Sequence, residues 1–241
     1  MMWHHGAVLE IDRTVTVERI ELGDGSSWVD IAQGFVVNPV ELLDELIREV
    51  PWNQGAVWRY DKYVDEHRLG AVVRRDALPT ALRQVGMHLE ARYRAKLMTP
   101  TMVYYRDGAD FQGMHSDREL RWLDNTLVGG VVLGAPRPLV MRPRGDWRNP
   151  ADRSDSSADV VLSPGRGDLM MMGGRCQRDF LHGVPPVEGS GPRISVIWRW
   201  TSRRGRPDTS PSYFDGFSYS SAESPKGYRS RRADKDRPIG T

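Results

Sequence analysis

The stretch RISVIWRW, residues 193–200, decides the fold because its side chains alternate between two kinds. Successive side chains of a strand point to opposite faces, so one face is aliphatic and aromatic while the other carries Arg193, Ser195 and Arg199. If the tryptophan face packs against helices, both arginines point into a barrel. They then need anionic partners, because unpaired buried charge costs several kcal/mol. The alternative is two arginines exposed on a sheet face.

The segments before this strand are short, rich in β-branched residues and separated by turn sequences. They are MVYY (102–105), LVGGVVL (127–133), PLVMR (138–142), DVVLS (159–163) and DLMMM (168–172). Six or more short strands at such spacing predict an antiparallel sandwich or barrel. The second half of the chain is therefore expected to be a β-structure.

Two helices are expected in the first half and should pack outside the strands, which makes the fold class α+β. Asn38-Pro39 predicts an N-cap followed by proline in the first turn, and apolar residues at helical spacing continue to Pro51. A second helix is predicted from about Pro79 to Leu97.

Composition excludes several classes of protein. The 241 residues include a single cysteine, Cys176, which excludes a disulfide framework and a thiolate cluster and suits a reducing compartment. We interpret Cys176 as a small buried filler. No run of about 18 apolar residues is present, so we expect a cytoplasmic protein with no membrane association, and a monomer.

The triplet His115-Ser116-Asp117 is a candidate metal half-site. Residues two apart in an extended segment share a face and lie about 7 Å apart along it, so their side chains can converge. The triplet His88-Leu89-Glu90 provides a comparison, because residues two apart on a helix point roughly 200° away from each other. Only the first triplet is expected to bind an ion.

A third ligand is needed, and His182 is the remaining histidine in the β-rich half. Two histidines and one carboxylate form the facial triad of non-heme Fe(II) oxygenases, which leaves coordination positions open. A structural zinc site normally takes four ligands, often cysteines, which this chain does not supply. The alternative is that His182 caps a loop and His115 lies on the surface.

Three blocks of sequence resemble the AlkB family of Fe(II)/2-oxoglutarate-dependent dioxygenases, in the family's order. They are YRDGADFQGMHSDRE (105–119), GDLMMMGGRCQRDFLHGVPP (167–186) and PRISVIWR (192–199). The resemblance covers about Met102 to Trp200 and implies a double-stranded β-helix, or jelly-roll, core. It implies a catalytic core over residues 101–202, preceded by an N-terminal extension (1–100) with strands, two helices and a substrate lid.

The resemblance also assigns residues. His115, Asp117 and His182 resemble the iron ligands and catalytic residues of the family. Four residues resemble those that bind the cosubstrate 2-oxoglutarate: Tyr105, Arg193, Ser195 and Arg199. Ser195, like Val103, stands where the family commonly has asparagine, which implies an altered grip on 2-oxoglutarate.

The implied reaction uses Fe(II), 2-oxoglutarate and O2 to demethylate N-alkylated bases of DNA or RNA, releasing formaldehyde, succinate and CO2. Glu119 lies where the family places an acidic residue facing the base; it shares the side of the iron ligands if the strand continues, and otherwise faces solvent. Trp58 and Tyr60 are candidates for a stacking platform, with core packing as the alternative.

Two other functions remain open: a 2-oxoglutarate-dependent hydroxylase of a small molecule or protein, and a catalytically inactive nucleic-acid-binding module. The tail, residues 203–241, carries nine Arg and Lys against five Asp and Glu. It is expected to be a disordered terminus, or an arm that attracts phosphates.

Overall fold

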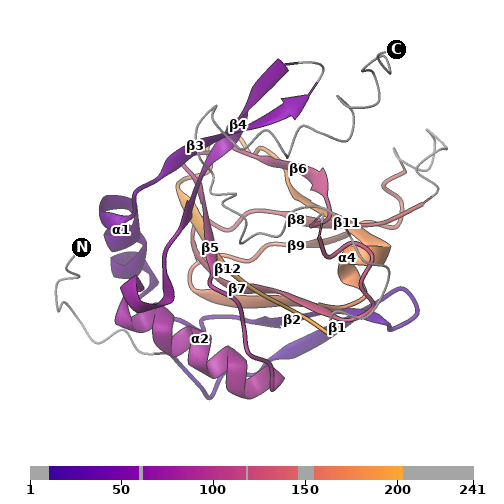
Figure 1. Ribbon diagram of the computed structural model, residues 1–241, viewed down its shortest axis with the longest axis horizontal. Helices are drawn as coiled ribbons and strands as arrows, with labels where there is room; N and C mark the ends of the chain where they lie inside the picture. Colours follow the sequence, from indigo (N-terminus) through magenta and orange to yellow (C-terminus); the bar gives the residue numbers. More distant parts are fainter. Residues whose placement is uncertain (1–10, 60–61, 118, 146–154, 203–241) are drawn as a thin grey trace, which may run out of the picture.

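The computed structural model describes residues 11–59, 62–117, 119–145 and 155–202 (Figure 1). The predictions for Tyr60 and for the basic tail fall outside these residues. The side chain of Trp58 is likewise not described, although its backbone belongs to a strand. Among the helices of the described ranges, none is long and apolar enough to cross a membrane.

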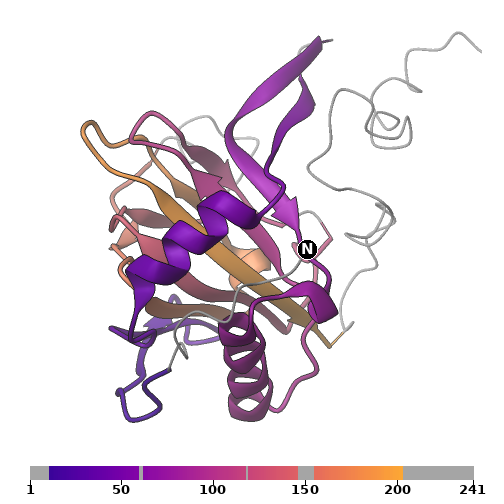
Figure 2. The ribbon, with the colours of Figure 1, turned by 90° about the vertical axis from the view of Figure 1, so that its left-hand side faces the viewer.

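The larger of two sheets has eight antiparallel strands and contains both the first and the last strand of the chain. Its order is β1 (Glu18–Leu22), β2 (Ser27–Ala32), β10 (Asp168–Gly174), β7 (Thr126–Gly134), β12 (Arg193–Thr201), β5 (Thr101–Tyr105), β4 (Lys62–Val72) and β3 (Asn53–Arg59). The strands of the N-terminal half thus extend both edges of the sheet, and the β3–β4 hairpin projects away from the rest of the strands (Figures 1 and 2).

The smaller sheet has four antiparallel strands and faces the larger one. Its order is β6 (Gln112–His115), β11 (Phe180–Val184), β8 (Leu139–Pro143) and β9 (Val160–Leu162). Side chains from the two sheets form one apolar cluster between them, which includes Tyr105 of the larger sheet and Met141 of the smaller. Two facing antiparallel sheets with helices outside confirm the predicted jelly-roll core and the α+β class.

Both predicted helices exist, with one corrected boundary. α1 (Pro39–Glu49) begins after Asn38, although the Asn38 side chain makes no capping hydrogen bond. α2 (Thr80–Tyr93) is shorter than the predicted span to Leu97, because Arg94 adopts the left-handed conformation (φ 49°) that ends a helix. A 3-10 turn, η1 (Arg75–Ala77), precedes α2, and a short helix, α4 (Cys176–Asp179), separates β10 from β11.

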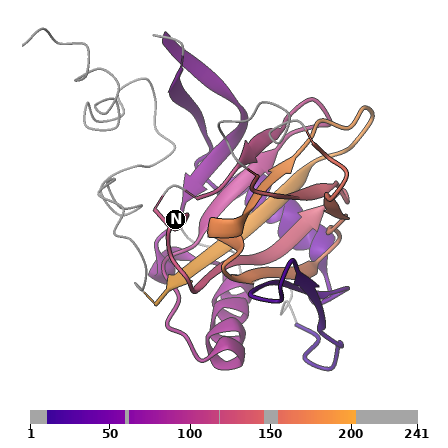
Figure 3. The ribbon, with the colours of Figure 1, turned by 90° about the vertical axis from the view of Figure 1, so that its right-hand side faces the viewer.

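The helices cover the outer face of the larger sheet. Figure 2 shows α1 and α2 against this face, and Figure 3, from the opposite side, shows the strands in front of α1. The apolar face of β12 packs into this layer, where Trp198 is only 1% exposed. Gly130 of β7 makes room for it, since a Cβ there would lie 2.6 Å from the Trp198 ring.

Candidate active site

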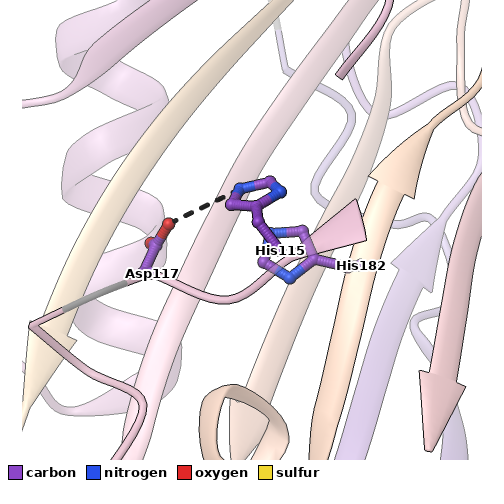
Figure 4. A group of neighbouring side chains, drawn as sticks. All are labelled: His115, Asp117 and His182. Carbon is purple, nitrogen blue, oxygen red and sulfur yellow. Dashed lines mark ion pairs between the residues drawn. The ribbon is translucent and has the colours of Figure 1, made fainter. Parts of the chain in front are cut away.

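Three side chains that the sequence proposes as a metal triad converge in the structure. One ligand atom from each of His115, Asp117 and His182 lies within 4.8 Å of the others (Figure 4). His115 ends β6 and His182 lies in β11, where the two are direct partners in the antiparallel register. Their rings are 4.3 Å apart between centroids, and His115 Nε2 lies 3.9 Å from Asp117 Oδ1. The His115 side chain remains 34% exposed, and His182 lies within a strand and not in a loop.

Asp117 lies in the turn after β6. The expectation that His115 and Asp117 share a face of one extended segment is therefore corrected. β6 ends at His115, and the backbone N–H groups of Leu120 and Arg121 both donate to the Asp117 carbonyl. The prediction placed Glu119 on the same side as the metal ligands on the assumption that the strand continues to residue 119. The strand ends at His115, so this reasoning is wrong. Glu119 lies, half-buried, in the turn.

The Asp117 carboxylate is buried and held ionised by its neighbours. Arg199 Nε donates to Asp117 Oδ2 (2.8 Å), while Arg199 Nη1 donates to Thr101 Oγ1 (2.6 Å). Burial alone raises the pKa of Asp117, but the charge of Arg199 and its hydrogen bond, together with the two histidine rings nearby, outweigh burial and place the pKa below its ordinary value. Arg199, predicted to bind the cosubstrate, thus contacts the carboxylate of the triad.

Gln177 fixes the same turn and was missed by the sequence analysis. It lies on α4, is fully buried, and its Oε1 accepts the Asp117 backbone N–H (2.7 Å). A glutamine in a polar stretch next to arginine and aspartate carries no sequence signal for such a role. Its position depends on how α4 folds back onto the β6 turn.

Both histidines favour the neutral, metal-binding form. Burial lowers the pKa of His115, and burial together with His115 lowers the pKa of His182 to about 3. His115 Nδ1 lies 3.0 Å from the Gly113 carbonyl, which can only accept a hydrogen bond. Nδ1 also lies 3.3 Å from Gln112 Nε2, but the shorter contact with the Gly113 carbonyl favours the proton on Nδ1 and leaves the lone pair on Nε2, the nitrogen that faces Asp117.

Arg193 lies on the same face of β12 and has unpaired donors. It is 1% exposed, and its Nε and Nη1 have no hydrogen-bond partner among the described residues. Burial lowers its pKa to about 10. Its guanidinium carbon lies 5.4 Å from the centre of the Tyr105 ring, with Arg137 at 5.3 Å from the same ring. A buried cation with free donors favours a carboxylate ligand at this point.

The remaining predicted residues are placed as follows. Ser195 is buried on the same strand face, between the two arginines. Cys176 is buried, its thiol donates to the Trp28 carbonyl (3.2 Å), and burial raises its pKa to about 11, in agreement with a filler. His88, in the comparison triplet, packs against the Phe35 ring at 5.0 Å and takes no part in the site.

The residues present fit a metal ion and a dicarboxylate. Two neutral histidines and one ionised carboxylate are a donor set for Fe(II), and His182 Nδ1 has no hydrogen-bond partner in the described part of the chain. The unpaired nitrogens of Arg193 provide a separate point for an anion. The two histidines lie on β6 and β11 of the smaller sheet, whereas Arg193 lies on β12 of the facing, larger sheet.

Comparison with known proteins agrees with this reading. Residues 33–232 match the family model of the 2OG-Fe(II) oxygenase superfamily. The chain is 24% identical over 219 residues to DNA oxidative demethylase ALKBH2 of Arabidopsis thaliana, covering 75% of this chain and 68% of that protein. It is 26% identical over 219 residues to alpha-ketoglutarate-dependent dioxygenase alkB homolog 3 of Mus musculus, covering 82% and 75%.

Among solved structures, a prolyl hydroxylase from Trichoplax adhaerens has a similar fold, with a TM-score of 0.50 and 12% identity over 78% of this chain and 84% of that one. The relatives found by sequence are more informative about the kind of enzyme than this structure, which at 12% identity shows the fold alone. The chain belongs to the 2OG-Fe(II) oxygenase superfamily and, within it, to the AlkB family, and it is an Fe(II)/2-oxoglutarate-dependent dioxygenase.

Proposed function

We propose that this enzyme removes methyl groups from N-alkylated bases of DNA or RNA. The single observation that carries the chemistry is the convergence of His115, Asp117 and His182. It is supported by Arg193, whose Nε and Nη1 have no partner among the described residues and which shares a face of β12 with Arg199, the residue that binds Asp117. The nucleic-acid substrate is supported by relatives whose names describe a DNA oxidative demethylase and alkB homologues.

His115, Asp117 and His182 would hold Fe(II), and Arg193 would bind one carboxylate of 2-oxoglutarate with its Nε and Nη1 donors. Together, Fe(II) and 2-oxoglutarate supply an oxidation by O2, in which the N-methyl group gains one oxygen atom and 2-oxoglutarate becomes succinate and CO2. The N-hydroxymethyl product then releases formaldehyde and the N–H base.

The chain's own residues prepare this site. Arg199 keeps the Asp117 carboxylate ionised and oriented, and Gln177 holds its backbone in place. The Gly113 carbonyl favours the metal-binding tautomer of His115. Because these hydrogen bonds exist before Fe(II) or 2-oxoglutarate binds, the metal-binding atoms are already in position and need little reorganisation.

The test is release of formaldehyde and succinate from single-stranded oligonucleotides that carry one N-methylated base, with unmethylated oligonucleotides as reference. His182→Ala should lose Fe(II) binding and turnover, because two ligands bind the metal weakly. His88→Ala is the matched control, since it removes a histidine from the comparison triplet on α2, and it should retain both.

Two results would contradict the proposal. Full activity of His182→Ala would reject the metal assignment. If the wild-type enzyme forms succinate with a protein or a small molecule but releases no formaldehyde from any methylated DNA or RNA, the chemistry stands and the nucleic-acid substrate is rejected.

A further inference from the structure

The β3–β4 hairpin of the larger sheet contacts the start of β6 in the smaller sheet. β4 pairs with β5 only over Leu69–Val72, so its earlier residues are not part of that ladder. The backbone N–H of Phe111, just before β6, donates to the His67 carbonyl of β4 (2.9 Å), and the two rings stack with 4.6 Å between their centroids. The hairpin, which the sequence analysis expects to be part of a substrate lid, is therefore joined to the strand that carries His115.

Side-chain contacts run from this hairpin to His115. Arg68 Nη2 donates to Glu66 Oε1 (2.8 Å), and both side chains are largely buried, at 9% and 17% exposed. Arg68 Nε donates to Gln112 Oε1 on β6. Gln112 Nε2 in turn lies 3.3 Å from His115 Nδ1. Gln112 thus links an arginine of the hairpin to a histidine of the metal site.

Arg68 determines which end of the Gln112 amide faces His115. A guanidinium has donors and no acceptor, so Arg68 Nε must meet the amide oxygen, and the amide NH2 group then points toward His115. The Gly113 carbonyl, 3.0 Å from the same Nδ1, can only accept. His115 Nδ1 therefore has one neighbour that requires its proton and another that requires its lone pair.

The two neighbours have opposite consequences for a metal ion. A histidine that binds a metal through Nε2 carries its proton on Nδ1 and donates it to an acceptor, which the Gly113 carbonyl provides. The Gln112 NH2 group disfavours this arrangement, because two donors then face each other. A Gln112 amide turned by 180° would instead offer its oxygen to His115, but it would turn its NH2 group toward Arg68.

We propose that Gln112 is a positioning residue through which Arg68 of the hairpin weakens metal binding by His115. While Arg68 holds the amide oxygen, the amide presents a donor to Nδ1. Without that contact the amide turns over, and its oxygen strengthens the hydrogen bonding of Nδ1. The affinity of the metal site thereby depends on the hairpin. The inference rests on the proposed function only in taking His115 as a metal ligand.

The first test titrates Co(II), as a substitute for Fe(II), into the metal-free protein and measures binding by calorimetry. Gln112→Leu keeps a side chain of similar length without the amide, and should bind Co(II) a few-fold more tightly than wild type. Arg68→Met should bind about tenfold more tightly, because the amide can turn over and add an acceptor. Gln54→Leu is the matched control, since Gln54 donates to the Glu66 carbonyl within the hairpin, and its affinity should stay within about twofold of wild type.

A double variant separates the amide from the charge of Arg68. After burial, this charge also lowers the pKa of His115, so its removal alone favours binding of a metal cation. If Arg68 acts through the amide, Arg68→Met should have no further effect on Co(II) affinity in the Gln112→Leu background. A pure charge effect would be equally large in both backgrounds.

Nitrogen-15 NMR of the metal-free protein with labelled histidine gives a readout that needs neither metal nor turnover. The two ring nitrogens of His115 report its tautomer, and their signals are assigned by their absence in His115→Gln. Gln112→Leu and Arg68→Met should both raise the fraction of His115 with the proton on Nδ1. Thermal unfolding checks that each variant is folded, and if Arg68→Met is not, Gln112→Leu decides alone.

The outcomes separate the inference from the proposed function. Co(II) binding by Gln112→Leu equal to or weaker than wild type, an unchanged tautomer, or equal effects of Arg68→Met in both backgrounds overturns the inference and leaves the proposed function standing. Tighter binding by both single variants, without a further gain in the double variant, supports the inference. If the wild type binds no Co(II), or if His182→Ala binds it equally well, the metal assignment fails and the inference fails with it.

Discussion

The two interior regions of this protein are built on opposite principles, and β12 contributes one face to each. The layer between the helices and the larger sheet is apolar, with Trp198 at its centre. The space between the two sheets receives the other face of the same strand and contains buried Arg193 and Arg199. The first region is arranged for stability, whereas the second combines an apolar cluster with buried charges, one of which, Arg193, has donors without a partner among the described residues.

The difference teaches that burial alone does not describe a core. Trp198 and Arg193 have the same exposed fraction, 1%. Burial of the Trp198 ring stabilises the fold, whereas burial of the unpaired Nε and Nη1 donors of Arg193 destabilises it. Replacing Trp198 and replacing Arg193 by apolar side chains should therefore change stability in opposite directions.

Trp198→Ala should give the largest effect, a loss of about 3–5 kcal/mol in unfolding free energy, because it leaves a cavity against α2 and Gly130. Thermal unfolding should show a fall of several degrees in Tm. Trp122→Ala is the control, since Trp122 is 36% exposed and should cost much less. Equal losses for the two tryptophans would contradict the description of the helix layer as the stabilising core.

Arg193→Met should raise the unfolding free energy of the ligand-free protein by about 1 kcal/mol or more. The reason is that the variant replaces a buried guanidinium with unpaired donors by an apolar side chain of similar length. The same change should remove most of the stabilisation that 2-oxoglutarate confers and raise the KM for 2-oxoglutarate at least about tenfold. Unfolding with and without 2-oxoglutarate measures both effects. A destabilised variant that still binds 2-oxoglutarate would show that Arg193 is structural.

Ser195→Ala should give the smallest effect. We expect a change in unfolding free energy below about 1 kcal/mol and an increase of a few-fold in the KM for 2-oxoglutarate, because Ser195 lies between the two arginines on the cosubstrate face. Ser27→Ala, at another buried serine of the larger sheet, is the control and should leave this KM unchanged. A normal KM in Ser195→Ala would remove Ser195 from the cosubstrate site.

Much of this arrangement could be predicted from local sequence pattern. The alternation of residues 193–200 predicts both faces of β12, and the structure confirms the alternative in which the tryptophan face packs against the helices. β5, β7, β8, β9 and β10 coincide with predicted strands. These elements could be recognised because period-two alternation and turn residues are local signals.

The rest depends on contacts that no local pattern contains. The position of Asp117 results from the turn that follows β6, from Gln177 on α4 and from Arg199 at the far end of the chain. Sequence reasoning found the right carboxylate but assumed an extended strand, and so placed Glu119 by a wrong argument.

The direct pairing of His115 with His182 across β6 and β11 limits how this family of chains can change in length. An insertion of one residue in either strand would turn a histidine to the opposite face of the sheet, and an insertion of two would restore the face but displace the ligand by roughly 7 Å. The β3–β4 hairpin, at the edge of the other sheet, carries no such constraint. A register shift between His182 and Val184 shows that an extra residue is accommodated beyond the paired histidines, so we expect length variation among relatives to collect in the hairpin more than at the histidine pair itself.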